Sequence, residues 1–199
     1  MSRKGLLALT GLLLGCGPPD PAVTSLNGAL LPTAAPRPSF TLTSTTGEPF
    51  GFAERTRGRL TLLFFGYTNC PDVCPATMAN LGAVLSKLTS DDRSRIDVIF
   101  VTTDPERDTP ERLTAWLGGF DREFIGLTGA PDAVAAAQRA AGVAPAIREG
   151  SGASYTVSHA AQVIVYSPDD STHIAYPFGT RQAQWAADLP TLLTRWTGR

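Results

Sequence analysis

Two cysteines separated by three residues are the strongest chemical feature of the sequence. Cys70 and Cys74 lie in the segment Cys-Pro-Asp-Val-Cys-Pro, soon after a run of apolar residues. On a helical turn, an i, i+4 spacing puts two side chains on one face, with β-carbons about 5–6 Å apart. Two sulfur atoms at this spacing can share a metal ion, and they can form a disulfide if the turn tightens. The pair therefore predicts a metal site or a redox site.

A metal site built on this pair needs a further ligand. Soft thiolates select Cu(I) or zinc, and two sulfurs alone leave either site incomplete. The chain has only two histidines, His159 and His173. His159 precedes an apolar run that we expect to form an inner strand, which would bring its loop near the cysteines. His173 is predicted to be a surface residue. A lone histidine is usually structural, so the residues alone leave the role of His159 open.

The cysteine pair lies where a strand is predicted to give way to a helix. The amino terminus of a helix stabilises a thiolate and can lower the pKa of a cysteine well below its free value. Asp72, between the two cysteines, is first interpreted as an acid in the first helical turn, where the helix dipole favours it. A lowered cysteine pKa is therefore expected here.

The elements that must position these residues form a strand–helix–strand unit. Residues 60–65 are almost all apolar, which is typical of a strand buried on both faces of a sheet. Apolar residues at helical spacing predict a helix over 74–90, and a second strand is predicted over 96–102. This order predicts a parallel pair of strands joined by a helix.

The rest of the chain extends this unit to one α/β domain. Residues 40–42 and 49–52 predict an N-terminal hairpin. A helix is predicted to begin at Asp108 as its cap, with Glu111 reaching back. A further strand (124–127) and helix (132–141), three β segments (155–157, 162–166 and 173–176) and a last helix (181–196, kinked or interrupted at Pro190) complete the series. The predicted fold is thioredoxin-like and peroxiredoxin-related, with a central mixed sheet flanked by helices.

The N-terminus is typical of an exported protein. Arg3 and Lys4 precede an uncharged, mostly apolar run over 5–14, which is too short to span a membrane. The run ends in Leu-Leu-Gly-Cys at Cys16, which resembles the lipobox of bacterial lipoproteins. We expect residues 1–15 to be a signal peptide and Cys16 to carry lipid. The protein would then be anchored on the outer face of the bacterial cytoplasmic membrane.

Proline-rich residues follow the predicted lipidation site, and they set the predicted start of the domain. Residues 16–38 contain six prolines and little apolar periodicity, so they predict a flexible tether. The folded domain is expected over 39–199.

Composition excludes several other classes of protein. The 199-residue chain has a formal net charge of −1 and a pI near 6.1, which argues against a nucleic-acid partner. Its three cysteines are too few for a disulfide scaffold or for a four-cysteine metal site.

Three segments together resemble the SCO/SenC family of copper chaperones with a thioredoxin-like fold. They are residues 65–75 around the cysteines, 101–111 after the second strand, and 155–159, which end in the histidine. The resemblance implies that Cys70, Cys74 and His159 bind one copper ion, as Cu(I) or Cu(II). It also implies delivery to the binuclear copper site of cytochrome c oxidase subunit II, with a further copper carrier or a thiol reductase as another partner. The family usually has aspartate before the histidine, whereas this chain has Ser158.

Other functions remain open at this point. A thiol–disulfide oxidoreductase that reduces the cysteines of the oxidase site is the main alternative to a metal carrier, with Cys70 and Cys74 as its redox pair. The three-residue spacing argues against it, since thioredoxin-like redox motifs have two. A peroxiredoxin-like peroxidase would need threonine or serine three residues before its cysteine, where this chain has Tyr67 or Pro71. Zinc bound by the same three ligands is the last alternative. A metal carrier, not an enzyme, is the expected function.

Overall fold

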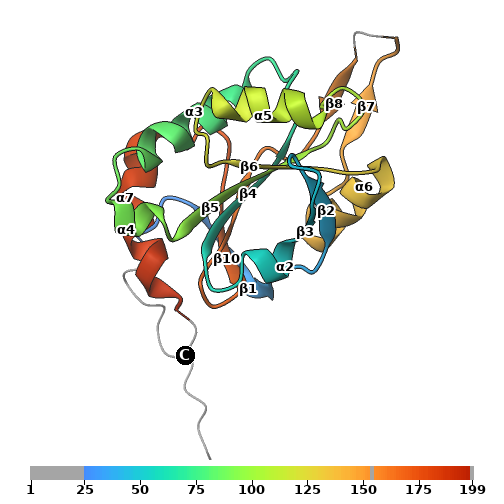
Figure 1. Cartoon of the computed structure of the whole chain (residues 1–199). Helices are drawn as coiled ribbons and strands as arrows, with labels where there is room; N and C mark the ends of the chain where they lie inside the picture. Colours follow the sequence, from blue (N-terminus) through green and yellow to red (C-terminus); the bar gives the residue numbers. More distant parts are fainter. Residues whose placement is uncertain (1–24, 153–154, 198–199) are drawn as a thin grey trace, which may run out of the picture.

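A mixed eight-stranded sheet forms the centre of the molecule, and helices cover both of its faces (Figure 1). The computed structural model describes residues 25–152 and 155–197. The strand order is β1-β10-β9-β4-β5-β6-β2-β3, and β7 and β8 form a separate hairpin. The strands are β1 (Ala29–Pro36), β2 (Thr41–Ser44), β3 (Pro49–Gly51), β4 (Leu60–Gly66), β5 (Ile96–Thr102), β6 (Ile125–Thr128), β7 (Ile147–Glu149), β8 (Thr156–Ser158), β9 (Val163–Tyr166) and β10 (Ser171–Tyr176). The helices are α2 (Phe52–Arg55), α3 (Val73–Leu85), α4 (Ser90–Arg93), α5 (Pro110–Gly118), α6 (Pro131–Ala140) and α7 (Gln182–Arg195).

The predicted strand–helix–strand unit is the core of this sheet. β4 is buried along its whole length, and it pairs with β5 in parallel from Leu60↔Ile96 to Gly66↔Thr102. On its other side β4 pairs with β9 in the antiparallel sense. Because β9 runs opposite to β4, the segment that enters β9 lies at the carboxyl end of β4, where the cysteine loop begins.

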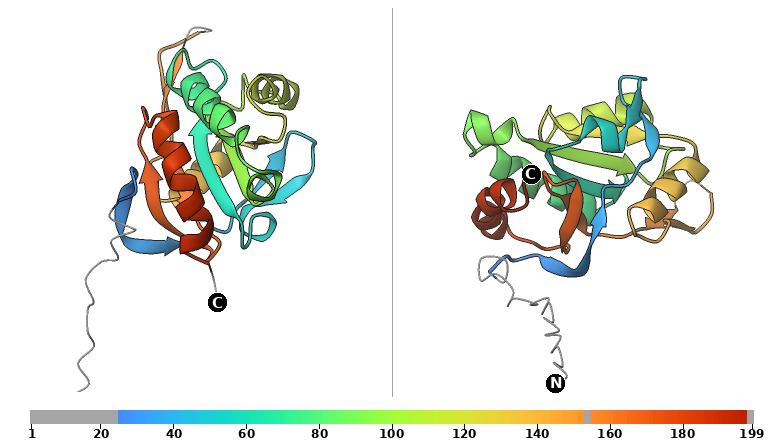
Figure 2. Two further views of the ribbon diagram at one scale, coloured as in Figure 1. Left: turned by 90° about the vertical axis from the view of Figure 1, so that its left-hand side faces the viewer. Right: turned by 90° about the horizontal axis from the view of Figure 1, so that it is seen from below.

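Alternating residues of β4 build two separate hydrophobic layers. Leu62 and Phe64 face the layer that includes α3, α5 and α7, whereas Leu63 and Phe65 face the layer that includes α2 and α6. This division follows from the two-residue period of a strand. Figure 2 shows α7 and α3 side by side over one face of the sheet, where their residues contact each other. The predicted α/β class is confirmed.

The ordered domain begins earlier than predicted. Residues 29–36, expected in the flexible tether, form the edge strand β1, which pairs with β10. The sequence pattern does not reveal this strand because all eight of its residues are exposed and backbone hydrogen bonds hold it. Arg37 then enters the protein interior, where its guanidinium donates to the hydroxyls of Thr56 and Thr61, each at 2.8 Å.

The structure also sharpens the description of three other elements. Helix α3 ends at Leu85 and not near Ser90, because Thr89 accepts a hydrogen bond from the Asp92 amide and starts the separate helix α4. Helix α7 continues through Pro190, so of the two predicted effects, a kink or an interruption, the interruption does not occur. Strand β7, which the pattern did not predict, pairs with β8, and all three of its residues are exposed.

The cap of α5 is also corrected. Thr109, and not Asp108, caps this helix by accepting from the Arg112 amide. The Asp108 side chain is fully buried and points to other partners, which are described below.

The predicted signal peptide, the predicted lipidation site Cys16 and the first part of the predicted tether lie outside the described residues. Within the described ranges, no helix is long and apolar enough to cross a membrane.

Candidate metal centre

The two cysteines lie on either side of the start of α3. Cys70 is in the loop after β4, and Cys74 is in the first turn of the helix. The Cys74 amide donates to the Cys70 sulfur over 3.4 Å. Asp72, at the N-cap position, makes no capping hydrogen bond, so the Cys70 sulfur accepts from an amide that the helix itself leaves without a partner. Both thiols are free.

A glycine at the end of β4 makes room for the second sulfur. A β-carbon at Gly66 would lie 2.8 Å from Cys74 Sγ and 2.7 Å from the Phe64 ring. Gly66 is a residue of the site that was not predicted from the sequence. The feature that could have identified it is a glycine at the end of a buried apolar strand, directly before a loop that carries a cysteine.

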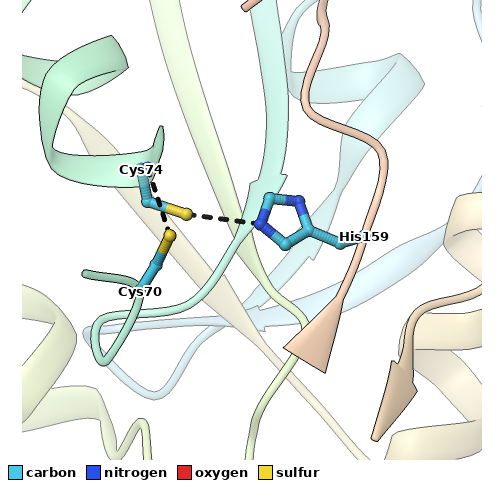
Figure 3. A group of neighbouring side chains, drawn as sticks. All are labelled: Cys70, Cys74 and His159. Atoms are coloured by element: carbon cyan, nitrogen blue, oxygen red, sulfur yellow. Dashed lines mark hydrogen bonds between the residues drawn. The ribbon is translucent and has the colours of Figure 1, made fainter. Parts of the chain in front are cut away.

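His159 reaches the cysteines from another part of the chain, beside the end of β4. It follows β8 and precedes β9, and its Nε2 lies 3.5 Å from Cys74 Sγ (Figure 3). Its Nδ1 lies 3.0 Å from the Ala160 carbonyl oxygen, which fixes Nδ1 as the protonated nitrogen. Nε2 is therefore free to coordinate. The rings of Phe64 and Tyr67 contact the imidazole edge-on, with centroids 5.9 and 5.8 Å away.

Burial sets the protonation of the site. It lowers the pKa of His159 below its ordinary value, which favours the neutral imidazole that a metal requires. Burial also raises the pKa of the Cys74 thiol far above its ordinary value. The expected lowering by the helix amino terminus is therefore wrong for Cys74, because this side chain is fully buried and desolvation outweighs the dipole.

The three ligand atoms converge. Those of Cys70, Cys74 and His159 lie within 4.8 Å of one another, and among the described residues this is the one such group of three or more Cys, His, Asp or Glu side chains. Metal–sulfur and metal–nitrogen bonds of about 2.0–2.3 Å place two ligand atoms at most about 4.5 Å apart. A small inward movement thus suffices for all three to bind one ion.

Other residues that the sequence singled out lie around or away from this group. Asp72 and Ser158 are both exposed, and Ser158 pairs with Ile147 at the base of the β7–β8 hairpin. Within the segment 101–111 of the resemblance, Asp104 and Arg107 form an ion pair. His173 lies on β10 and contacts Asp169 instead of the cysteines.

The relationship of the sequence to known proteins agrees with this geometry. The profile of the SCO1/SenC family matches residues 29–194. The chain belongs to the SCO1/SenC family. The match includes β1 as well as all three residues of the site.

Individual SCO1/SenC relatives cover the chain to different extents. A candidate copper-binding protein of Stutzerimonas stutzeri is 32% identical over 183 residues, 88% of each chain. The mitochondrial protein SCO2 of Saccharomyces cerevisiae is 40% identical over 95 residues, which are 48% of this chain and 31% of the yeast protein. The chain thus matches only about a third of the length of the yeast relative.

Solved structures of SCO1/SenC relatives have the same fold. The apo Sco1 protein of Thermus thermophilus is 33% identical, with a TM-score of 0.76 over 85% of this chain and 98% of that one. Bradyrhizobium japonicum ScoI, solved with copper bound, is 32% identical, with a TM-score of 0.71 over 80% of this chain and all of that one. The predicted thioredoxin-like arrangement is confirmed by these matches.

Proposed function

We propose that this protein binds one copper ion through Cys70, Cys74 and His159 and passes it to a partner. The observation that carries the proposal is the convergence of two thiols and a neutral imidazole within 4.8 Å. Sulfur ligands select soft ions, and two thiolates with one imidazole suit Cu(I) in a three-coordinate site. The copper-bound structure of a relative that is 32% identical supports copper over zinc.

The protein's own groups prepare the site for this cargo. The Ala160 carbonyl holds the proton of His159 on Nδ1, which leaves Nε2 ready to coordinate. Cys74 keeps its proton in the metal-free protein, because burial raises its pKa, and releases it on coordinating the ion. Cys70 retains 9% of its surface exposed, whereas Cys74 has none. A partner's thiolate can therefore reach the ion from the Cys70 side.

The proposed recipient is the binuclear copper site of cytochrome c oxidase subunit II. Membership of the SCO1/SenC family supports this choice. A second copper carrier is the proposed donor. Ser158, in place of the family's usual aspartate, removes a negative charge next to His159 and would lower the preference for Cu(II).

Membership of the SCO1/SenC family and the N-terminal sequence also support attachment of the protein to the membrane. We propose that residues 1–15 are removed, that Cys16 carries lipid, and that the following residues link it to β1. The protein would then lie on the outer face of the bacterial cytoplasmic membrane. Replacement of Cys16 by serine should release the protein into the soluble fraction and abolish labelling with a radioactive fatty acid.

Copper transfer is tested directly with the detergent-solubilised full-length chain. Loaded anaerobically with Cu(I), it should retain one equivalent and lose it to the soluble domain of an oxidase subunit II. Cys70→Ser should retain none. If the intact chain binds no copper, the carrier proposal fails. If it binds copper but transfers none, the choice of recipient is wrong.

The two free sulfurs, which lie within 4.8 Å of each other, support a second candidate, a thiol–disulfide reductase for the cysteines of the oxidase site. The reduction potential of the Cys70–Cys74 pair separates the two functions. A value far below the working range of the compartment would exclude a catalytic disulfide.

A further inference from the structure

The loop between β5 and α5 contacts both segments that carry the candidate ligands. It covers residues 103–109, and it extends from the strand that pairs with β4. The Thr103 amide donates to the Gly66 carbonyl over 2.7 Å, and the Thr103 hydroxyl donates to the same oxygen over 3.1 Å. The loop is thus attached to the end of β4 at the point where the cysteine loop starts.

A buried carboxylate joins this loop to the cysteine side of the site. Asp108, with no exposed surface, accepts from the Thr68 amide (2.9 Å), the Thr68 hydroxyl (2.5 Å) and the Thr102 hydroxyl (2.7 Å). Thr68 lies two residues before Cys70. A buried carboxylate that accepts three hydrogen bonds holds its partners firmly, since hydrogen bonds to an ionised group are stronger than those between neutral groups. The backbone that leads into Cys70 is therefore fixed by Asp108.

Arg112 extends this contact to the surface. Its Nε donates to the Thr68 hydroxyl over 2.7 Å, and its Nη2 donates to the Asn69 side chain. The guanidinium lies 4.0 Å from Asp108, and about half of its side chain is exposed. Arg112 thus balances the buried charge and holds the residue directly before Cys70.

A second set of contacts joins the same loop to the histidine side. The Tyr155 hydroxyl donates to Asp104 over 2.6 Å, and Arg107 donates to the Tyr155 carbonyl over 3.1 Å. The Arg107 guanidinium also lies 3.5 Å from the centroid of the Tyr155 ring and forms an ion pair with Asp104. Tyr155 enters β8, four residues before His159. Arg148 covers the other face of its ring at 3.6 Å.

We infer that the β5–α5 loop, together with Arg112 in the first part of α5, positions the metal site by contacting both the cysteine segment and the histidine segment. Asp108 and Arg112 position Cys70, and Asp104 with Arg107 positions the strand that leads to His159. The cysteines and the histidine lie more than eighty residues apart in the chain, and Cys70 and His159 both reach the site from irregular segments. Without a shared attachment the distance between sulfur and imidazole would vary, and part of the binding free energy would be lost in ordering them. This inference rests on the proposed copper site.

The test uses two pairs of matched variants of the full-length chain. Asp188 is a buried aspartate that also accepts three hydrogen bonds, from the Asn27 amide, the Asn27 side chain and the Tyr176 hydroxyl. Asp108→Asn and Asp188→Asn therefore make the same chemical change inside and outside the positioning contacts. Tyr155→Phe and Tyr176→Phe form a second pair, since each removes a 2.6 Å hydrogen bond to a buried aspartate.

Three quantities are measured for each variant: Tm, Cu(I) affinity by competition with a chelator, and the sulfur-to-copper charge-transfer spectrum of the Cu(II) form. We expect all four variants to lower Tm. Copper affinity should fall about 10–100-fold for Asp108→Asn, the range seen when groups that orient metal ligands are removed. It should fall about threefold for Tyr155→Phe, and the spectrum should shift in both. Asp188→Asn and Tyr176→Phe should keep the parent affinity and spectrum.

Parent affinity and spectrum in Asp108→Asn and Tyr155→Phe, with Tm lowered as in their controls, would overturn the inference and reduce the loop to a structural role. If Asp108→Asn does not fold, Arg112→Gln at the exposed end of the network replaces it and should weaken copper binding about threefold to tenfold. An unchanged affinity there would equally refute the inference. If the parent chain itself binds no copper, the proposed function fails instead.

Discussion

The two histidines of this protein lie in regions that use the same side chain in opposite ways. His159 is largely enclosed by Phe64, Tyr67 and the Cys74 sulfur, and its contacts hold it neutral with Nε2 directed at a soft ligand. His173, on β10, places its Nε2 2.7 Å from the Asp169 carboxylate and stacks on Trp196 with centroids 4.4 Å apart.

This difference shows what makes a histidine available to a metal. A carboxylate neighbour occupies Nε2 of His173, whereas a carbonyl on Nδ1 and an apolar enclosure leave Nε2 of His159 free and its ring neutral. We call the surroundings of His159 and the cysteines the site region, and those of His173 the His173 region. Four experiments test the contrast between the two regions, and the expected effect decreases from the first to the last.

The largest effect is expected from the sulfurs of the site region. Cys74→Ser replaces a soft ligand with a hard oxygen of nearly the same size, so the protein should retain no Cu(I) after desalting. Metal analysis of the anaerobically loaded chain measures this. Cys16→Ser is the control and should retain one equivalent. Copper bound by the Cys74→Ser variant would show that the ion sits elsewhere.

Exchange of the two histidines for alanine should separate metal binding from stability. His159→Ala removes a ligand and should lower Cu(I) affinity about 100-fold. His173→Ala should leave affinity unchanged and reduce the free energy of unfolding by about 1 kcal/mol, since it loses one partly exposed hydrogen bond to Asp169 and one stacked ring. Chelator competition and urea unfolding measure the two effects. Equal loss of affinity in both variants would contradict the comparison.

A smaller effect tests how tightly the site region is packed. Gly66→Ala places a methyl group against Cys74 Sγ and the Phe64 ring, so it should cost about 1–3 kcal/mol of stability and displace the sulfur. Gly118→Ala is the control, because a β-carbon there meets nothing within 4 Å in a helix. It should be neutral or slightly stabilising. A Gly66→Ala protein as stable as the control would show that the pocket around Cys74 is loose.

The smallest effect concerns pH. The pKa of His159 in the folded metal-free protein lies below its ordinary value of 6.5, so near and below pH 6.5 the unfolded chain binds a proton that the folded chain does not. Stability from this group is therefore present above pH 6.5 and falls as the pH drops towards the folded pKa. The Tm of His159→Gln should decrease less between pH 7 and pH 5 than that of the intact chain. His173→Gln serves as the comparison, and an identical slope in His159→Gln and the intact chain would exclude the effect.

The sequence predicted those parts of the fold that depend on neighbours along the chain. The apolar run of β4 and the helical spacing of α3 gave the strand–helix–strand unit correctly, because period and burial are local properties. Strand β1 was missed since its residues are all exposed and only pairing with β10 makes it a strand. Asp108 was misread as a helix cap because its true partners, Thr68 and Thr102, lie on other elements.

The same division applies to the site. The ligand types and the spacing of Cys70 and Cys74 could be predicted from the sequence, because both cysteines lie close together in the chain at the predicted strand-to-helix junction. Only the tertiary structure decided that His159 meets them, since this depends on the antiparallel pairing of β9 with β4. It also decided that burial raises the pKa of Cys74, where the helix start alone predicted a decrease. Desolvation and distance are set by the whole fold, and no local pattern of residues encodes them.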